Sequence, residues 1–258
     1  HSSLADPNAV TFQTNKKSDV YESPNTDSHV YTALSAGTNV NIVKQGSTWH
    51  EISIGVWRNA KRSDVEQYLD PNNNDRFQHL VLTSSVGVDA NELNRVLKGK
   101  GILENLGQAF IDAGAKHSIN EVYLIAHALL ETGNGTSKLA NGIKVNGKTV
   151  YNMFGIGAYD DCPESCGAQF AYDKGWDTPY KAIVGGAEFI TSYLKRGQDT
   201  LYKMRWNFVY HRINDYGNKE YPQYATDIGW AVKQTNSIRE IYDQLNNPFL
   251  HFDIPVYK

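Results

Sequence analysis

One glutamate lies where the sequence could place a catalytic acid, at the end of an apolar helix. Asn120 is of the residue type that caps a helix N-terminus, apolar residues then recur at helical spacing, and the helix is expected to stop at Gly133. Glu131 would lie in the last turn, where the negative end of the helix dipole and the preceding Leu130 favour a neutral carboxyl group. Such a group can donate its proton to a glycosidic oxygen. A solvated glutamate at a helix end has the same local pattern, so both interpretations stay open at this point.

Three separated motifs follow in order and place Glu131 in a wider context. They read Glu131-Thr132-Gly133-Asn134-Gly135-Thr136-Ser137, Tyr151-Asn152-Met153-Phe154-Gly155-Ile156-Gly157 and Gln223-Tyr224-Ala225-Thr226-Asp227-Ile228-Gly229-Trp230-Ala231. Together with residues 98–104 and 185–190, they closely resemble the glucosaminidase domains of bacterial autolysins, glycoside hydrolase family 73, from about Val65 to the C-terminus. The resemblance implies a lysozyme-like fold and an exported endo-β-N-acetylglucosaminidase that acts on the glycan strands of peptidoglycan.

The same resemblance implies roles for individual residues. Glu131 matches the general acid of the family, and Tyr224 matches a tyrosine facing that acid across the cleft, where its hydroxyl could orient a water or the acetamido group of the substrate. The amide of Asn152 can bond sugar hydroxyl or N-acetyl groups, and the ring of Phe154 can pack on a sugar face. Asn152 could equally be a turn residue, and Phe154 could be a core residue. The expected substrate-binding residues are Asn134, Tyr151, Asn152, Phe154, Gly155, Gln223 and Asp227.

The sequence leaves the second catalytic group open. A retaining glycosidase needs a second carboxylate about 5–5.5 Å from the acid, an inverting one about 6.5–9.5 Å, and a substrate-assisted enzyme needs none. We favour assistance by the N-acetyl carbonyl of the substrate, with Tyr224 positioning it. Asp160 is the preferred base if the protein supplies one, and an ordinary loop acid is its alternative. His127, one turn before Glu131, is expected to be a structural histidine rather than a catalyst.

The N-terminal part of the chain shows a β-like pattern. Short alternating runs lie between Val20 and about Asp64, separated by turn residues. They resemble a bacterial SH3-like (SH3b) module, and the polar residues 1–19 before them predict a loose arm. We therefore expect a small SH3-like β-barrel over residues 20–64.

The pattern changes to helical spacing after a predicted linker over residues 70–75. Three apolar stripes predict core-facing helices, and a β-hairpin over residues 143–151 interrupts them, with Asn146-Gly147 suited to a type I′ turn. The fold class is therefore expected to be α+β, with a mainly helical, lysozyme-like catalytic domain over residues 65–258. The hairpin would form a small lobe, with the cleft between lobe and helices.

Composition and charge disfavour several partners. The 258 residues include 25 Lys and Arg against 28 Asp and Glu, a net charge of −3, so there is no basic field to recruit nucleic acid. The longest nearly apolar stretch, residues 122–130, is far shorter than the roughly 20 residues of a membrane span. Nothing in the motifs demands a cofactor or a metal. We expect a monomer that is secreted or associated with the bacterial cell wall, and its partner to be the peptidoglycan glycan strand.

The two cysteines and the histidines bear on rival functions. Cys162 and Cys166 could close a small loop on the hairpin lobe, and export favours this bridge over free thiols. A cysteine peptidase is disfavoured because the acidic loop would not activate a thiol, and a metal-dependent amidase because the eight His lack a compact zinc-ligand spacing. A muramidase or lytic transglycosylase on the same architecture stays an alternative, as does a catalytically inactive wall-binding module.

Overall fold

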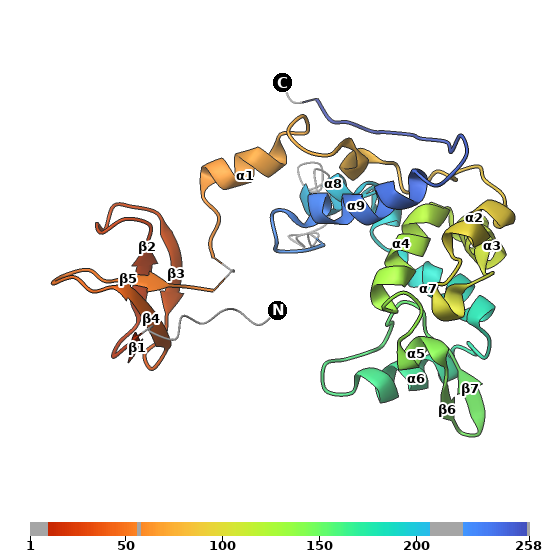
Figure 1. Cartoon of the computed structure of the whole chain (residues 1–258), viewed down its shortest axis with the longest axis horizontal. Coiled ribbons are helices and arrows are strands. Elements are labelled where there is room, and N and C mark those ends of the chain that lie inside the picture. The colour runs from red at the N-terminus through yellow and green to blue at the C-terminus, as the bar shows by residue number, and fades with distance from the viewer. Residues whose placement is uncertain (1–9, 56–57, 207–223, 257–258) are drawn as a thin grey trace. The chain divides into compact units, whose positions relative to one another are not determined.

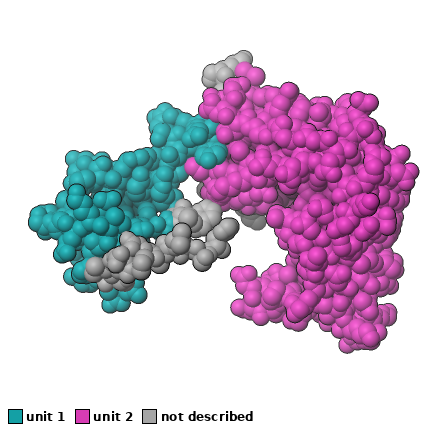
Figure 2. Space-filling model, in the orientation of Figure 1, with its two compact units in different colours: residues 1–69 teal, residues 70–258 magenta. Residues whose placement is uncertain are grey.

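The computed structural model describes residues 10–55, 58–206 and 224–256. The chain divides into two units, unit 1 with residues 1–69 and unit 2 with residues 70–258 (Figures 1 and 2). Each unit has its own secondary structure, and the two are described separately.

Unit 1 consists of short antiparallel strands and one helix. One sheet has the order β1-β4-β5, and β2 pairs with β3 in a second sheet. The bounds are β1 Val10–Gln13, β2 Ser18–Tyr21, β3 Val30–Leu34, β4 Asn39–Lys44, β5 Glu51–Ser53 and α1 Arg62–Leu69.

The structure of unit 1 differs from the expected pattern at three points. Residues 10–13, expected within a loose arm, form β1 because they pair with β4, a distant partner that the local pattern does not reveal. Asp64 lies inside α1 and the compact unit extends to Leu69, while the division into an SH3b-like module and a catalytic domain stays a prediction. The described strands pair in two separate sheets and form no closed barrel.

Unit 2 is mainly helical (Figure 1). Its elements are η1 Arg76–His79, α2 Ala90–Val96, η2 Gly101–Leu103, α3 Gly107–His117, α4 Glu121–Glu131, α5 Lys138–Asn141, β6 Ile143–Val145, β7 Lys148–Val150, α6 Pro163–Asp173, α7 Pro179–Ile190, η3 Leu194–Arg196, α8 Leu201–Trp206 and α9 Trp230–Tyr242.

The core of unit 2 forms where these helices meet. α3 packs on α7, and α4 packs against both α3 and α9. Phe110 of α3, Ile125 of α4 and Ile183 of α7 are fully buried in one contiguous cluster. The apolar stripes predicted from helical spacing are therefore confirmed as core, and α4 runs through its centre. No helix in the described ranges combines the length and apolar character that crossing a membrane requires.

The hairpin lobe has the predicted geometry. β6 pairs with β7 in antiparallel register, and Asn146 and Gly147 both have positive φ, 49° and 80°, as a type I′ turn requires. β6 and β7 pack on α6, and a Cys162–Cys166 disulfide links the cap of α6 to its first turn. Figure 2 shows unit 2 hollowed between this lobe and the helices that include α9.

Candidate active site

The helix that ends in Glu131 is held firmly at its start. The Asn120 side chain caps α4 by accepting from Tyr123 N–H at 3.0 Å. Its amide group donates to the Ser84 carbonyl at 3.0 Å and to the Tyr242 hydroxyl at 2.9 Å, which joins α4 to α9. This confirms the predicted cap and bounds of the helix, so the position of Glu131 follows from a buried, fixed element.

The segment after Glu131 turns sharply and packs on residues 98–104. Gly133, Asn134 and Gly135 all have positive φ, between 56° and 79°. A Cβ on Gly135 would overlap the Lys100 carbonyl, and the Gly135 carbonyl accepts from Ile102 N–H at 3.2 Å. The Asn134 amide oxygen accepts from the Lys100 ammonium at 3.1 Å. Glycine is required here because two backbone segments meet, and a sugar contact by Asn134 stays a prediction.

The Glu131 carboxyl group has two different neighbours. Its Oε1 lies 3.5 Å from His127 Nε2, while its Oε2 would lie 3.4 Å from a Cβ on Gly155, which has a φ of +64°. The side chain is 39% exposed, so solvent and ligands can reach it. Leu130 is 68% exposed, so it does not bury the carboxyl group in an apolar pocket. Because a helix presents successive residues to different faces, Leu130 need not share the face of Glu131.

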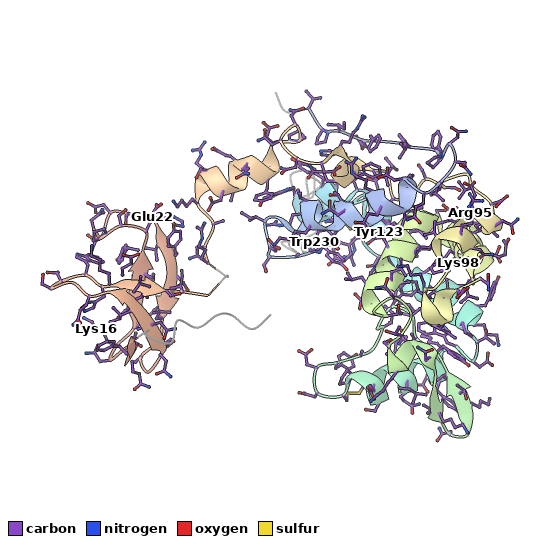
Figure 3. All side chains as sticks on the ribbon, viewed as in Figure 1. Lys16, Glu22, Arg95, Lys98, Tyr123 and Trp230 are labelled. Atoms are coloured by element: carbon purple, nitrogen blue, oxygen red, sulfur yellow. A yellow bond between two sulfur atoms is a disulfide. The ribbon has the colours of Figure 1, made fainter. Side chains whose placement is uncertain are left out.

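Tyr224 lies just before α9 and is within electrostatic reach of Glu131. Its ring contacts Tyr193, at 5.0 Å between centroids, and stacks at a tilt on Trp230, at 4.4 Å. Burial raises the pKa of Tyr224, and the negative charge of Glu131 raises it further. The hydroxyl is therefore a proton donor at neutral pH and lies within electrostatic reach of the carboxyl group. Figure 3 labels Trp230 at the start of α9 and Tyr123 on α4, the two helices that bring these groups together.

Asp227 holds the backbone that carries Tyr224. Its carboxylate accepts from Gly229 N–H at 2.9 Å and pairs with Lys233. These hydrogen bonds lower the pKa of Asp227 against the opposing effect of desolvation. The Arg205 guanidinium donates to the Asp227 carbonyl at 2.7 Å. Asp227 thus builds the loop, and its predicted contact with substrate stays untested.

Asn152 and Phe154 lie in the interior, where they shape the loop after β7. The Asn152 amide donates to the carbonyls of Ile156 and Gly167, at 2.8 and 3.2 Å, and its oxygen accepts from the N–H groups of Phe154 and Ile156. Phe154 is 4% exposed and packs against Gly186. Both side chains face protein, which is the turn and core alternative left open by the sequence, and direct contact with sugar stays a prediction.

The remaining predicted residues are spread out. Tyr151 is half-buried, and its N–H donates to the Trp176 carbonyl at 2.9 Å. Asp160 is exposed in the loop before α6, and Gln223 lies outside the described residues. Among the described residues, no group of three or more His, Cys, Asp or Glu side chains could hold a metal ion.

Sequence reasoning placed His127 one turn before Glu131 on the same helix face without assigning a contact between them, and it missed the aromatic contacts around Tyr224. The spacing of four residues on one helix was a signal for the first, because such residues share a helix face. No local pattern indicates that Tyr193 meets Tyr224, since they come from distant segments.

Known proteins resemble this chain over most of its length. Residues 107–243 match the glucosaminidase family, described as mannosyl-glycoprotein endo-beta-N-acetylglucosaminidase. The beta-N-acetylglucosaminidase of Bacillus subtilis is 51% identical over 232 residues, which cover 86% of this chain and 25% of that protein. A bifunctional autolysin of Staphylococcus aureus is 46% identical over 218 residues, which cover 79% and 17%. The chain therefore spans a quarter or less of the length of these curated relatives.

Solved structures agree with this assignment. The major bifunctional autolysin superposes with a TM-score of 0.67 at 45% identity, covering 80% of this chain and 86% of that one. A catalytic mutant of S. aureus autolysin E, crystallised with the disaccharide NAG-NAM, superposes with a TM-score of 0.59 at 37% identity, covering 77% and 86%. The matching motifs, the helical fold and these similarities together show that the chain belongs to the glucosaminidase family.

Proposed function

We propose that this chain is a peptidoglycan hydrolase that cleaves the β-1,4 bond after N-acetylglucosamine in glycan strands. Its family membership supports a glycoside hydrolase. Two relatives support the substrate: one is named a beta-N-acetylglucosaminidase, and another was crystallised with NAG-NAM. In this proposal Glu131 is the general acid, and its proton goes to the oxygen that leaves with the next sugar.

The observation that carries the proposal is the pairing of Glu131 with Tyr224. The Glu131 carboxyl group is partly exposed at the end of a buried helix, and burial and then the charge of Glu131 raise the pKa of Tyr224, which supports a protonated hydroxyl group within electrostatic reach of the carboxyl group. The hydroxyl can donate a hydrogen bond to the acetamido group of the substrate or orient a water. A proton donor and a positioning donor are what cleavage of an N-acetylated glycoside needs.

We favour the substrate's own N-acetyl carbonyl as the nucleophile. Asp227 is engaged with Lys233 and Gly229, so it is poorly suited to act as a base. Asp160 is exposed on the loop before α6 and is the protein base in the alternative route. In the favoured route, replacing Asp160 by Asn leaves the rate of product release close to that of the unchanged chain. In the alternative route, the same change abolishes release.

Unit 1 is proposed to be an SH3b-like module that holds the enzyme on the wall. Aromatic side chains lie at or near its surface: Trp49, before β5, is partly exposed and its ring meets that of Tyr21 at 5.5 Å, while Arg58 lies over the ring of Tyr31 at 4.4 Å. Such a surface suits peptide or glycan ligands. A secreted or wall-associated location follows from the same proposal.

The test is mass spectrometry of fragments released from purified peptidoglycan and reduced with borohydride. The chain, Glu131→Gln and Glu188→Gln are compared, because Glu188 is an exposed glutamate on α7 and serves as a matched control. We expect reducible N-acetylglucosamine ends from the chain and the control, and none from Glu131→Gln. Reducible or anhydro N-acetylmuramic acid ends would instead establish a muramidase or a lytic transglycosylase. No product from any variant would favour a wall-binding module.

A further inference from the structure

His127 connects the carboxyl group of Glu131 to the buried loop after β7. Its ring makes T-shaped contacts with two aromatic rings, with centroid distances of 6.0 Å to Tyr123 and 5.8 Å to Phe154. Its side chain is only 16% exposed, and its Nε2 lies 3.5 Å from Glu131 Oε1. The imidazole is therefore held on two sides and faces the carboxyl group with one nitrogen.

The two oxygens of Glu131 consequently have different surroundings. Oε1 has the His127 nitrogen beside it, whereas Oε2 lies next to Gly155, a residue without a side chain. A proton on Oε1 would compete with an N–H donor on His127, and a proton on Oε2 would not. Since the Glu131 side chain is 39% exposed, a substrate can approach the carboxyl group.

We propose that His127 is a positioning residue for the reaction: its Nε2–H holds Oε1 of Glu131, so that the catalytic proton resides on Oε2, beside Gly155. This inference rests on the proposed function. The Oε2–H bond breaks as the proton passes to the glycosidic oxygen, whose bond to C1 of the N-acetylglucosamine breaks and leaves its electron pair on that oxygen, while the N-acetyl carbonyl oxygen of the same sugar forms a bond to C1. The N–H of His127 stays in place and stabilises the carboxylate that forms, an interaction stronger in the transition state than in the ground state.

Asn152 and Phe154 support the position of His127 beside Glu131. Asn152 fixes the Phe154 backbone through the bond from Phe154 N–H. A Cβ on Gly186 would overlap the Phe154 ring, so this ring is closely seated against α7. The ring then limits the orientation of His127. These residues act on Glu131 through His127 and need no contact with sugar.

Few charged groups compete for the imidazole. On its own helix it faces Tyr123 and Glu131, and from the loop after β7 it faces the apolar ring of Phe154. Tyr224, from the segment before α9, acts electrostatically on both Tyr123 and Glu131. Among these described neighbours, Glu131 is the one that carries a carboxyl group. The pH dependence of kcat therefore reports on the contact between His127 and Glu131.

The test compares His127→Gln and His127→Phe in the full chain, using release of reducible ends from purified peptidoglycan. Glutamine keeps an N–H donor near the position of Nε2, while phenylalanine keeps the ring and loses the donor. We expect kcat to fall by up to about 100-fold in His127→Phe, with KM and Tm little changed, and to recover largely in His127→Gln. Unchanged kcat in His127→Phe, or a loss explained by Tm or KM alone, would overturn the inference.

The dependence of kcat on pH is a second readout, because a role of His127 in packing alone would not change it. Without the N–H donor, the limb of kcat that reports loss of the Glu131 proton moves to higher pH, because the donor stabilises the charged carboxylate. A profile identical to that of the unchanged chain contradicts the proposal. His117→Gln is the matched control, since His117 Nε2 contacts the Val184 carbonyl at 2.9 Å and not a carboxylate, and we expect its profile to be unchanged.

A measurement without activity separates this inference from the proposed function. The ¹⁵N spectrum of the histidine-labelled chain, assigned by comparison with His127→Gln, shows which ring nitrogen of His127 carries the proton. We expect Nε2–H, with a signal that changes in Glu131→Gln. A proton on Nδ1 alone would refute the inference even if the chain proves to be a glucosaminidase. Absence of reducible N-acetylglucosamine ends with Nε2–H intact would refute the proposed function instead.

Discussion

The carboxyl group of Glu131 and the hydroxyl group of Tyr224 act on each other, although one ends α4 and the other lies just before α9. The helix pair that brings them together is fixed by Asn120, which caps α4 and donates to Tyr242 of α9. A buried contact at the far end of α4 therefore fixes this helix against α9.

Removing the Tyr224 hydroxyl is expected to slow catalysis without unfolding the chain. Tyr224→Phe keeps the ring contacts with Tyr193 and Trp230 but loses the donor, so kcat should fall by roughly 100-fold while Tm changes little. Initial rates of product release and thermal unfolding check this. Tyr180→Phe is the control, because its hydroxyl donates to Asp112 elsewhere in unit 2. Equal rates in the two variants would contradict the role of Tyr224.

The same tyrosine sets an expectation for pH dependence. Burial first, and then the charges of Glu131 and Tyr193, raise the pKa of Tyr224 above its usual value near 10. Its hydroxyl therefore keeps its proton throughout the neutral and mildly alkaline range. The alkaline limb of kcat should be the same in the unchanged chain and in Tyr224→Phe, measured up to about pH 9. A limb that disappears in the variant would show that Tyr224 titrates there.

A methyl group at position 155 is expected to hinder the acid. Gly155→Ala places a Cβ at 3.4 Å from Glu131 Oε2, at a φ of +64°. Gly147→Ala is a matched control, because Gly147 has a φ of +80° and open space around it. Both changes cost about 1–2 kcal/mol in backbone strain. We expect only Gly155→Ala to lose kcat beyond what its stability explains, and similar rates in both would show that Oε2 is not the reacting oxygen.

Asn152 is expected to contribute mainly to stability. Asn152→Ala leaves two carbonyls and two N–H groups without their side-chain partner in a site that is 2% exposed. The free energy of unfolding should fall by roughly 2–4 kcal/mol. Urea denaturation checks this against Asn236→Ala, an exposed position on α9 where alanine favours the helix. Equal stability of the two variants would contradict the buried network.

Acid is expected to destabilise unit 2 through His79. Burial lowers the pKa of His79, against the hydrogen bond to the Pro71 carbonyl and the charge of Asp253. Below about pH 6.5 the unfolded chain binds a proton that folded His79 does not, so the free energy of unfolding falls as the pH drops towards the folded pKa. Urea denaturation at pH 7.5 and pH 5.5 should show a smaller drop for His79→Gln than for the exposed control His50→Gln. Equal decreases in the free energy of unfolding in the two variants would show that groups other than His79 cause the acid sensitivity.

Local patterns were sufficient for much of the catalytic unit. The cap at Asn120, the end of α4 at Glu131 and the type I′ turn at Asn146-Gly147 depend on residues close in sequence, and each was predicted correctly. The core stripes were also recognisable, since burial of a helix face imposes a regular spacing. The family resemblance rested on motifs of the same local kind.

Tertiary structure decided what those motifs do. Asn152 and Phe154 are expected to contact sugar, and folding buries both side chains, with the Phe154 ring packed against His127 and against Gly186 of α7. Likewise, β1 is a strand only because β4 pairs with it from a distant part of the chain. The sequence by itself determined the residue types available for chemistry and the helix that ends in Glu131. Which groups face that carboxyl was decided by contacts between distant segments, whose energies no local spacing encodes.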